Sequence, residues 1–192
     1  MPDYTLTAKT SLDGYCRDFA GVSIHEVNDR AIVSIAVPKD GERELANVLT
    51  SSYQIELPKP GILSVTSRDN AVLFNTAQDQ YFLVFDYAGN TATSVVRNLL
   101  GDTAYLTDQS DSYVIVRISG INSRRLLERI CPLDIHPSVF PVGSVARTVM
   151  EHLGTIIIHD VEDSFLLLSA RSSAYSFLEA IETSAANTEP VN

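Results

Sequence analysis

The stretch RAIVSIAV at residues 30–37 is an apolar, β-branched run of strand length, and it decides the fold because a similar run returns later in the chain. The later run is SYVIVRIS at residues 112–119. Each run is followed by apolar residues that share one helical face: Leu45, Val48 and Leu49 in the first case, and Leu126, Leu127 and Ile130 in the second. The sequence therefore predicts a strand and then a helix, twice.

The remaining elements repeat in the same order. Three strand-like segments follow each helix, and a second helical segment closes each unit. The strands are expected at 61–67, 71–75 and 80–87, and again at 144–152, 155–161 and 164–171; the closing helices carry Val95, Val96 and Leu99, and Phe177, Leu178 and Ile181. The opening strands lie 82 residues apart (31 to 113), and the closing strands lie 83 apart (82 to 165).

We predict an α+β fold of two similar βαβββα units that arose by internal duplication, with antiparallel or mixed sheets and helices packed on them. Chance is the alternative to duplication, because alternation of strands and helices is common. The expected organisation is an N-terminal docking arm at 1–19, a first unit at 20–107, a second unit at 108–185 and a flexible tail at 186–192. An extra strand at 21–27 is expected to pair with 30–37 across a turn.

The composition is that of an ordinary globular protein with an acidic balance. The chain has 192 residues, of which 45% are hydrophobic, and a net charge of −10. This charge argues against nucleic acid or an anionic membrane as a partner, because both require a basic face. Cys16 and Cys131 fit reduced thiols, with a disulfide as the alternative. The longest apolar runs are strand-sized, so we expect a cytoplasmic protein without a membrane span.

Motifs that hold nucleotide cofactors or build common active sites are absent from the sequence. No two of the nine glycines are separated by a single residue, which excludes GxGxxG, and there is no GxxxxGK, GxSxG or CxxC. Of the four histidines, His152 and His159 bracket a predicted hairpin, and we interpret them as satisfied surface or core groups. If a flavin or nicotinamide takes part in the function, we expect another chain to hold it.

The segment CPLDIHPSVFP at 131–141 is the strongest candidate for chemistry. Cys131, Asp134 and His136 could be a nucleophile, an orienting acid and a base, or three metal ligands. No further cysteine or histidine follows nearby as a fourth ligand, and nothing indicates a pocket with an oxyanion donor. A structural loop explains more residues, because Pro132 ends the preceding helix and Pro137 and Pro141 stiffen the path. We therefore predict a packing loop with no catalytic, cofactor-binding or metal-binding residue.

This loop lies within a longer pattern that resembles a known family. TDQSD precedes a strand that ends in SG, a helix follows, and then come CPLDIHP and FPVG before a pair of strands. The pattern is similar to the gamma subunit of heterotetrameric sarcosine oxidase, most specifically over residues 104–158. The tryptophans that the family shows in its closing helix are replaced here by Tyr175 and Phe177.

The resemblance implies a fold like that of the folate-binding aminomethyltransferases, with two related halves. It also implies a complex with alpha, beta and delta subunits that converts sarcosine to glycine, with H2O2 and methylenetetrahydrofolate as the other products. In that scheme FAD, FMN and NAD belong to the alpha and beta subunits, zinc belongs to the delta subunit, and the gamma chain is non-catalytic and holds no cofactor. No folate ligand can be transferred to this chain from the resemblance.

Two alternatives remain open at the level of sequence. One is the equivalent subunit of a related complex, such as N-methylglutamate dehydrogenase, and the other is a stand-alone folate-binding protein of the aminomethyltransferase type. In the subunit hypotheses we expect a permanent interface with a flavoprotein subunit. Aromatic residues of the polar N-terminal arm, Tyr4, Tyr15 and Phe19, are the candidates for that interface.

Overall fold

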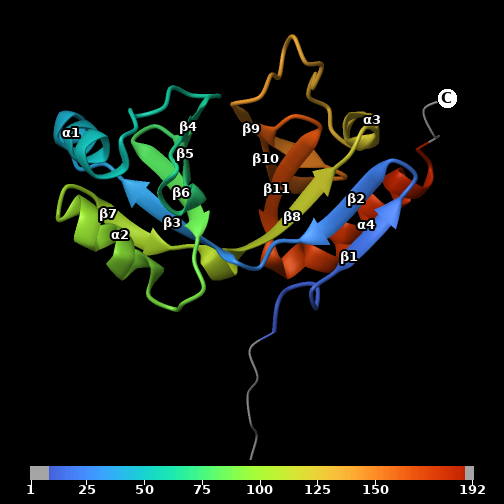
Figure 1. Ribbon diagram of the computed structural model, residues 1–192, viewed down its shortest axis with the longest axis horizontal. Coiled ribbons are helices and arrows are strands. Elements are labelled where there is room, and N and C mark those ends of the chain that lie inside the picture. The colour runs from blue at the N-terminus through green and yellow to red at the C-terminus, as the bar shows by residue number, and fades with distance from the viewer. Residues whose placement is uncertain (1–8, 189–192) are drawn as a thin grey trace, which may run out of the picture.

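The computed structural model describes residues 9–188, which form an α+β structure with two antiparallel sheets (Figure 1). The six-stranded sheet has the order β1 (Cys16–Phe19), β2 (Val22–Glu26), β8 (Tyr113–Ser119), β11 (Ser164–Ala170), β10 (Leu153–Val161) and β9 (Ser144–Met150). The five-stranded sheet has the order β4 (Leu63–Val65), β5 (Val72–Ala77), β6 (Gln80–Asp86), β3 (Arg30–Ala36) and β7 (Tyr105–Asp108). Every strand pair is antiparallel.

The predicted βαβββα order occurs twice. The first unit runs β3, α1 (Glu42–Tyr53), β4, β5, β6 and α2 (Ala92–Leu100). The second runs β8, α3 (Ser123–Glu128), β9, β10, β11 and α4 (Ala174–Ala186). Short 3-10 turns lie at Arg68–Asn70, Ser110–Ser112 and Arg171–Ser173. The structure therefore confirms the order of elements that the sequence predicts.

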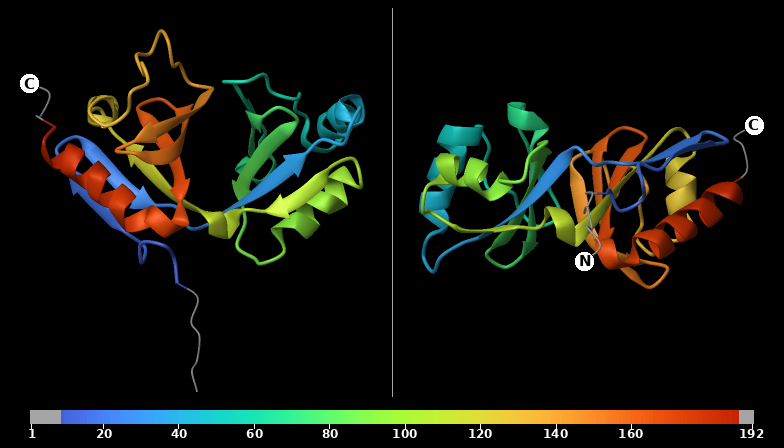
Figure 2. Two further views of the ribbon diagram at one scale, coloured as in Figure 1. Left: turned by 180° about the vertical axis from the view of Figure 1, so that it is seen from behind. Right: turned by 90° about the horizontal axis from the view of Figure 1, so that it is seen from below.

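The two units exchange the strands that precede them, β2 and β7, which we call the lead strands. β2 comes just before β3 in the chain but pairs with β8 of the second unit, with Ile24 opposite Ile118. β7 comes just before β8 but pairs with β3 of the first unit, with Ile35 opposite Leu106. Figures 1 and 2 show the two crossing connections at the waist between the units.

The predicted pairing of 21–27 with 30–37 is therefore wrong, although the strand itself exists. Both edges of β3 are occupied, one by β6 and the other by β7, so no edge is left for β2. Val22 and Ile24 instead fill the core of the second unit. The backbone continues this attachment past β2, because the Val27 N–H donates to the Ile115 carbonyl at 2.9 Å.

The expected boundaries change accordingly. β1, inside the expected arm at 1–19, and β2, inside the expected first unit at 20–107, both belong to the six-stranded sheet of the second unit. Residues 1–8 of the expected arm and 189–192 of the expected tail lie outside the described residues. The described part of the tail is ordered by packing, since Thr188 is buried and its hydroxyl donates to the Ser184 carbonyl at 2.9 Å.

Three apolar clusters hold these layers together. One lies between the six-stranded sheet and helices α3 and α4, and a second lies between the five-stranded sheet and helices α1 and α2. The third joins the opposite faces of the two sheets and includes Ile32, Phe74 and Phe82 on one side and Ile156 and Leu168 on the other. Burial of apolar area on this scale is the main stabilising contribution to folding, and here it couples the two units.

Candidate functional site

The loop at 131–141 does not assemble a catalytic group from its reactive side chains. Cys131 is buried, whereas Asp134 and His136 are exposed. The Asp134 carboxylate accepts the His136 backbone N–H at 3.0 Å, and His136 Nδ1 lies 2.8 Å from the Ser138 hydroxyl. Among the described residues, neither side chain is hydrogen-bonded to the Cys131 thiol. These two polar groups shape the loop and leave the thiol in the core.

The prolines bound this loop as expected. The Cys131 N–H still bonds to the Leu127 carbonyl at 2.8 Å, and the next residue, Pro132, has no N–H with which to continue a helix. Ile135 and Phe140 are buried and anchor the loop to the second unit. Val139 in the same loop is 58% exposed.

The side chain that ties the loop to the sheet is His159, which the sequence predicted only as a satisfied surface or core group. His159 on β10 is buried, and its Nδ1 lies 3.0 Å from the Phe140 carbonyl oxygen. Its ring stacks on Phe165 with centroids 4.5 Å apart, and the Arg124 guanidinium lies 5.2 Å from the same phenyl centroid. Arg124 also donates to the Ile135 carbonyl. A single histidine in a strand belongs to no motif with a defined spacing, so the contacts of His159 with Phe140 and Phe165 can be seen only in the tertiary structure.

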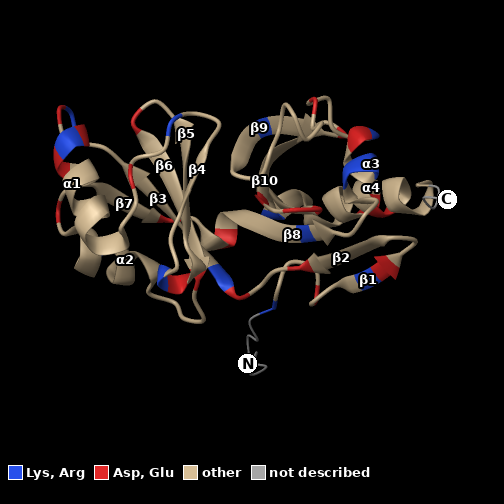
Figure 3. Ribbon diagram, turned by 45° about the horizontal axis from the view of Figure 1, so that its top comes forward, with Lys and Arg blue, Asp and Glu red and all other residues tan. Residues whose placement is uncertain are grey.

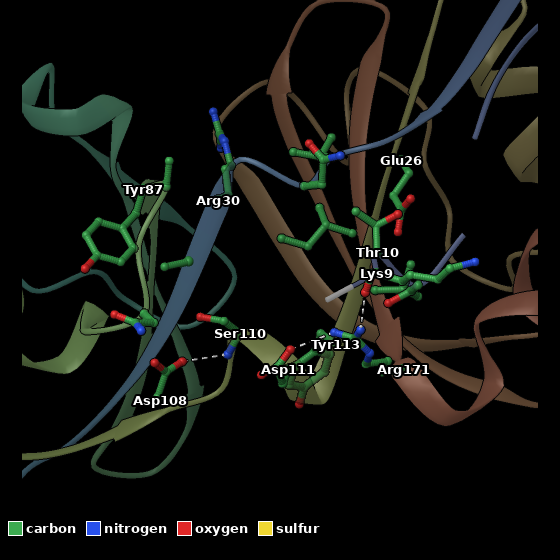
Figure 4. Close-up of a pocket in the computed structure, with 18 of the residues that line it drawn as sticks. Lys9, Thr10, Glu26, Arg30, Tyr87, Asp108, Ser110, Asp111, Tyr113 and Arg171 are labelled. Atoms are coloured by element: carbon green, nitrogen blue, oxygen red, sulfur yellow. Dashed lines mark hydrogen bonds and ion pairs between the residues drawn. The ribbon is translucent and has the colours of Figure 1, made fainter. Parts of the chain in front are cut away.

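A large cavity lies at the waist, where the lead strands cross between the units (Figure 4). It is an open groove of about 660 Å³. Charged side chains from both units and from the segment before β1 line it: Lys9, Glu26, Arg30, Asp108, Asp111 and Arg171. The strand exchange places these residues together, because the groove is formed where β2 leads into β3 and β7 leads into β8.

Most charged side chains in this groove form ion pairs with one another or hydrogen bonds with the backbone. Arg171 pairs with Asp111 at 2.7 Å and donates to the Lys9 carbonyl at 2.9 Å, and Figure 4 shows this contact. The two Glu26 carboxylate oxygens accept the backbone N–H groups of Leu12 and Gly14 at 2.9 and 2.8 Å. The arm residues before β1 are thereby fixed to the second unit.

Two groove residues with reactive side chains, Ser110 and Asp108, each accept a hydrogen bond from a backbone N–H. The Ser110 hydroxyl accepts the Ile32 N–H of β3 at 3.0 Å, and the Ser110 N–H donates to the Asp108 carboxylate at 2.9 Å, so the first bond ties the β7–β8 connection to β3 and the second closes the turn. No cysteine or histidine lines the groove. Within residues 9–188 there is also no cluster of three or more side chains placed to hold a metal ion. The groove is a polar contact region between the two units.

Two of the three expected interface residues pack against the chain's own core. Tyr15 and Phe19 are partly buried beside the cluster under α3 and α4. The Tyr15 hydroxyl donates a 2.6 Å hydrogen bond to Glu182 on α4, and burial together with this bond raises the pKa of Tyr15 to about 12. Arg17 covers the Phe19 ring at 4.8 Å. Tyr4 lies outside the described residues.

The charged residues do not gather by sign on one unit. Figure 3 shows acidic and basic residues interspersed over both. The helices of residues 9–188 are all too short or too polar to cross a membrane.

Comparison with known proteins identifies the family. The family model described as "Sarcosine oxidase, gamma subunit family" matches residues 40–187. A curated relative, sarcosine oxidase subunit gamma of Corynebacterium sp. (strain P-1), is 22% identical over 112 residues; the match covers 58% of this chain and 55% of the relative. The chain thus spans about half the length of this curated relative.

Two solved structures share the fold. A chain of the heterotetrameric sarcosine oxidase from Corynebacterium sp. U-96, solved with pyrrole 2-carboxylate, superposes with a TM-score of 0.78 at 18% identity, covering 96% of this chain and 98% of that chain. The glycine cleavage system aminomethyltransferase T of Bartonella henselae gives a TM-score of 0.56 at 15% identity, covering 85% of this chain and 46% of that chain. Because the family model matches most of its length, this chain belongs to the sarcosine oxidase gamma subunit family.

Proposed function

We propose that this chain is the gamma subunit of a heterotetrameric sarcosine oxidase and works there as a non-catalytic, permanently bound partner of the alpha, beta and delta subunits. The observation that carries the proposal is the family match over residues 40–187. The similarity in fold to a chain of a heterotetrameric sarcosine oxidase, nearly complete for both chains, supports it.

In this proposal the chemistry takes place on the other subunits. They convert sarcosine to glycine by oxidative demethylation, with formation of H2O2 and methylenetetrahydrofolate, and they hold FAD, FMN, NAD, tetrahydrofolate and zinc. The gamma chain contributes a folded surface on which the assembly is built, and the complex works in the cytoplasm. The equivalent subunit of an N-methylglutamate dehydrogenase is the alternative, and it differs in substrate.

The geometry of both candidate sites supports a structural role. The polar groups of the 131–141 loop bond within the loop, and the Cys131 thiol is buried in the core. At the waist, the Ser110 hydroxyl accepts the Ile32 N–H of β3, and the Asp108 carboxylate accepts the Ser110 N–H. A chain whose polar groups are engaged in this way is suited to hold a shape.

Co-expression of the full chain with the alpha-like, beta-like and delta-like subunits tests the proposal. We expect all four chains to co-purify at a fixed ratio, the complex to oxidise sarcosine in preference to N-methylglutamate, and the gamma chain alone to be colourless and inactive. A flavin bound stoichiometrically to the isolated chain would contradict the non-catalytic role. Elution of the chain as a separate monomer beside its assembled partners would overturn the subunit role itself.

A further inference from the structure

The two units meet a second time on the side away from the waist, where the segments before β4 and β9 converge at the top of Figure 1. Ile62 and Ser144 form an isolated antiparallel bridge there. The Leu63 N–H donates to the Gly143 carbonyl at 2.8 Å, and the Val145 N–H donates to the Gly61 carbonyl at 3.0 Å. We call the exposed apolar residues of these two segments the crest: Pro60, Ile62, Pro137, Val139, Pro141 and Val142; the same segments also expose Lys59, Asp134, His136 and Ser138.

The crest presents apolar atoms to solvent. Ile62 is 52% exposed, Val139 is 58% exposed and Val142 is 47% exposed. The cores of protein interfaces are depleted of charged residues, and large exposed apolar side chains gathered in one place mark interaction sites.

The crest is also stiff and has few unmet polar groups. Its two halves are bonded to each other, and the Gly143 N–H is held by the His159 carbonyl at 2.8 Å. Within the loop, the N–H groups of Val139 and Phe140 both donate to the His136 carbonyl, at 2.9 and 2.8 Å. Three prolines restrict the remaining backbone. A surface ordered before binding loses little conformational entropy when a partner covers it.

A socket opens beside the crest. It is a cavity of about 450 Å³ lined by Pro60, Gly61, Phe74, Val145, Ile156 and Arg147, among others. Its floor is apolar, and Arg147 stands at its rim with a single hydrogen bond, from Nη1 to the Thr76 carbonyl at 3.3 Å. Neither Arg147 nor the neighbouring Lys59 pairs with a carboxylate of residues 9–188. Several other cations, Arg43 among them, also lack a carboxylate partner among the described residues, but of these Arg147 alone lines the socket.

We infer that the crest and its socket are the docking surface for a different subunit of the oxidase, which inserts an apolar side chain into the socket and places a carboxylate against Arg147. The inference rests on the proposed function and specifies where the partner sits. A second copy of this chain fits less well, because its docking would bring two acidic proteins of equal charge together. Burial of an apolar anchor in a dry pocket, with a charged pair at the rim, is the arrangement that dominates binding energy at interfaces.

The test is assembly of the four-subunit complex with substituted full-length gamma chains. Ile62→Asp and Val139→Asp each place a charge in the crest, one from each unit, and Arg147→Glu reverses the rim charge. Tyr105→Asp is the control for the crest, since Tyr105 is 70% exposed but lies on β7, at the opposite edge of the five-stranded sheet from β4. Arg43→Glu on α1 is the control for the rim, because Arg43 is also exposed and also pairs with no described carboxylate.

We expect each crest variant to weaken assembly at least tenfold, and Arg147→Glu to weaken it and reduce its dependence on salt, while both controls assemble like the wild type. Thermal unfolding of each isolated variant shows whether the chain is still folded.

If folded crest variants assemble normally, the docking surface lies elsewhere and the inference fails, although the proposed function stands. If the wild-type chain alone dimerises through the crest, the occupant is a second copy and the inference is also overturned. If the wild type joins no partner, it is the proposed function that fails.

Discussion

Arg117 on β8 and Asp160 on β10 form a bidentate ion pair across the intervening strand β11, with Nη1–Oδ1 at 2.9 Å and Nη2–Oδ2 at 2.7 Å. The same Arg117 nitrogen, Nη1, also donates to the Ser164 hydroxyl on β11 at 2.8 Å. The two side chains are only 18% and 10% exposed. They therefore join three strands of the six-stranded sheet through groups that have little access to water.

Asp160→Ala should destabilise the chain strongly, because it leaves the Arg117 guanidinium largely buried without its counter-charge. Removal of one partner from a buried ion pair costs about 3–5 kcal/mol. Urea denaturation of the isolated chain measures the change. Asp102→Ala is the control: Asp102 pairs with Arg97 at 3.5 Å, but its side chain is 98% exposed, so its loss should leave the midpoint unchanged. Equal effects of the two substitutions would contradict this account.

Arg117 also affects a histidine. His25 on β2 is the register partner of Arg117, and burial, followed by the charge of Arg117, lowers the pKa of His25 below 6.5, while Asp29 acts in the opposite direction. The unfolded chain therefore binds this proton at a higher pH than the folded chain does. Stability should fall as the pH drops below about 6.5, and this contribution should level off once the folded histidine is protonated.

His25→Gln should remove that part of the acid destabilisation. The free energy of unfolding of the wild type and the variant, measured from neutral pH to below pH 6.5, should diverge at the acid end. His152→Gln, at an exposed histidine in the β9–β10 turn, is the matched control and should follow the wild type. Parallel curves for His25→Gln and the wild type would show that the burial of His25 has no such effect.

The elements followed from the sequence, but the way the two units are joined did not. Apolar spacing predicted the buried residues Leu45 and Leu49 on α1, and Leu126 and Leu127 on α3, because a local period reports a helical face. The exchange of β2 and β7 was missed, because strand pairing is decided by which sheet edges are free, and that is a property of the whole fold. The short, exposed strands β1 and β7 have little apolar pattern to reveal them.

Turns and the candidate site show the same limit. The predicted hairpin between β9 and β10 turns at Glu151 and His152, both with positive φ. Glutamate and histidine, unlike glycine, do not indicate a left-handed backbone conformation in a sequence. The packing role of the 131–141 loop was derived from its prolines, whereas the contacts of His159 and Arg124 depend on strands far away in sequence.

The two thiols should differ sharply in reactivity, since Cys16 is exposed and Cys131 is buried. A thiol reagent should modify one cysteine per native chain and two in denaturant, and Cys16→Ser should leave no reactive thiol in the native chain. Cys131→Ala should cost about 1–3 kcal/mol through loss of packing, without abolishing turnover of the complex. Zinc that binds stoichiometrically, and whose chelation unfolds the chain, would show instead that Cys131 is a metal ligand.

At alkaline pH, Tyr15 and Tyr53 should limit stability. Burial, and then the hydrogen bond to Glu182, raise the pKa of Tyr15 to about 12; burial, and then the charge of Asp69, raise the pKa of Tyr53 to about 12. Unfolded tyrosines ionise near pH 10, so between pH 10 and about 12 the unfolded chain loses protons that the folded chain keeps. Stability should therefore fall with rising pH in this window.

The double variant Tyr15→Phe/Tyr53→Phe tests this. It should be less stable than the wild type below pH 10, because it lacks the 2.6 Å bond to Glu182, but it should lose less stability as the pH rises. Denaturation curves below pH 10 and within the window, with Tyr105→Phe at a 70% exposed site as control, distinguish this from general alkaline unfolding. If the double variant and the control lose stability in parallel, the two buried phenols do not set the alkaline limit.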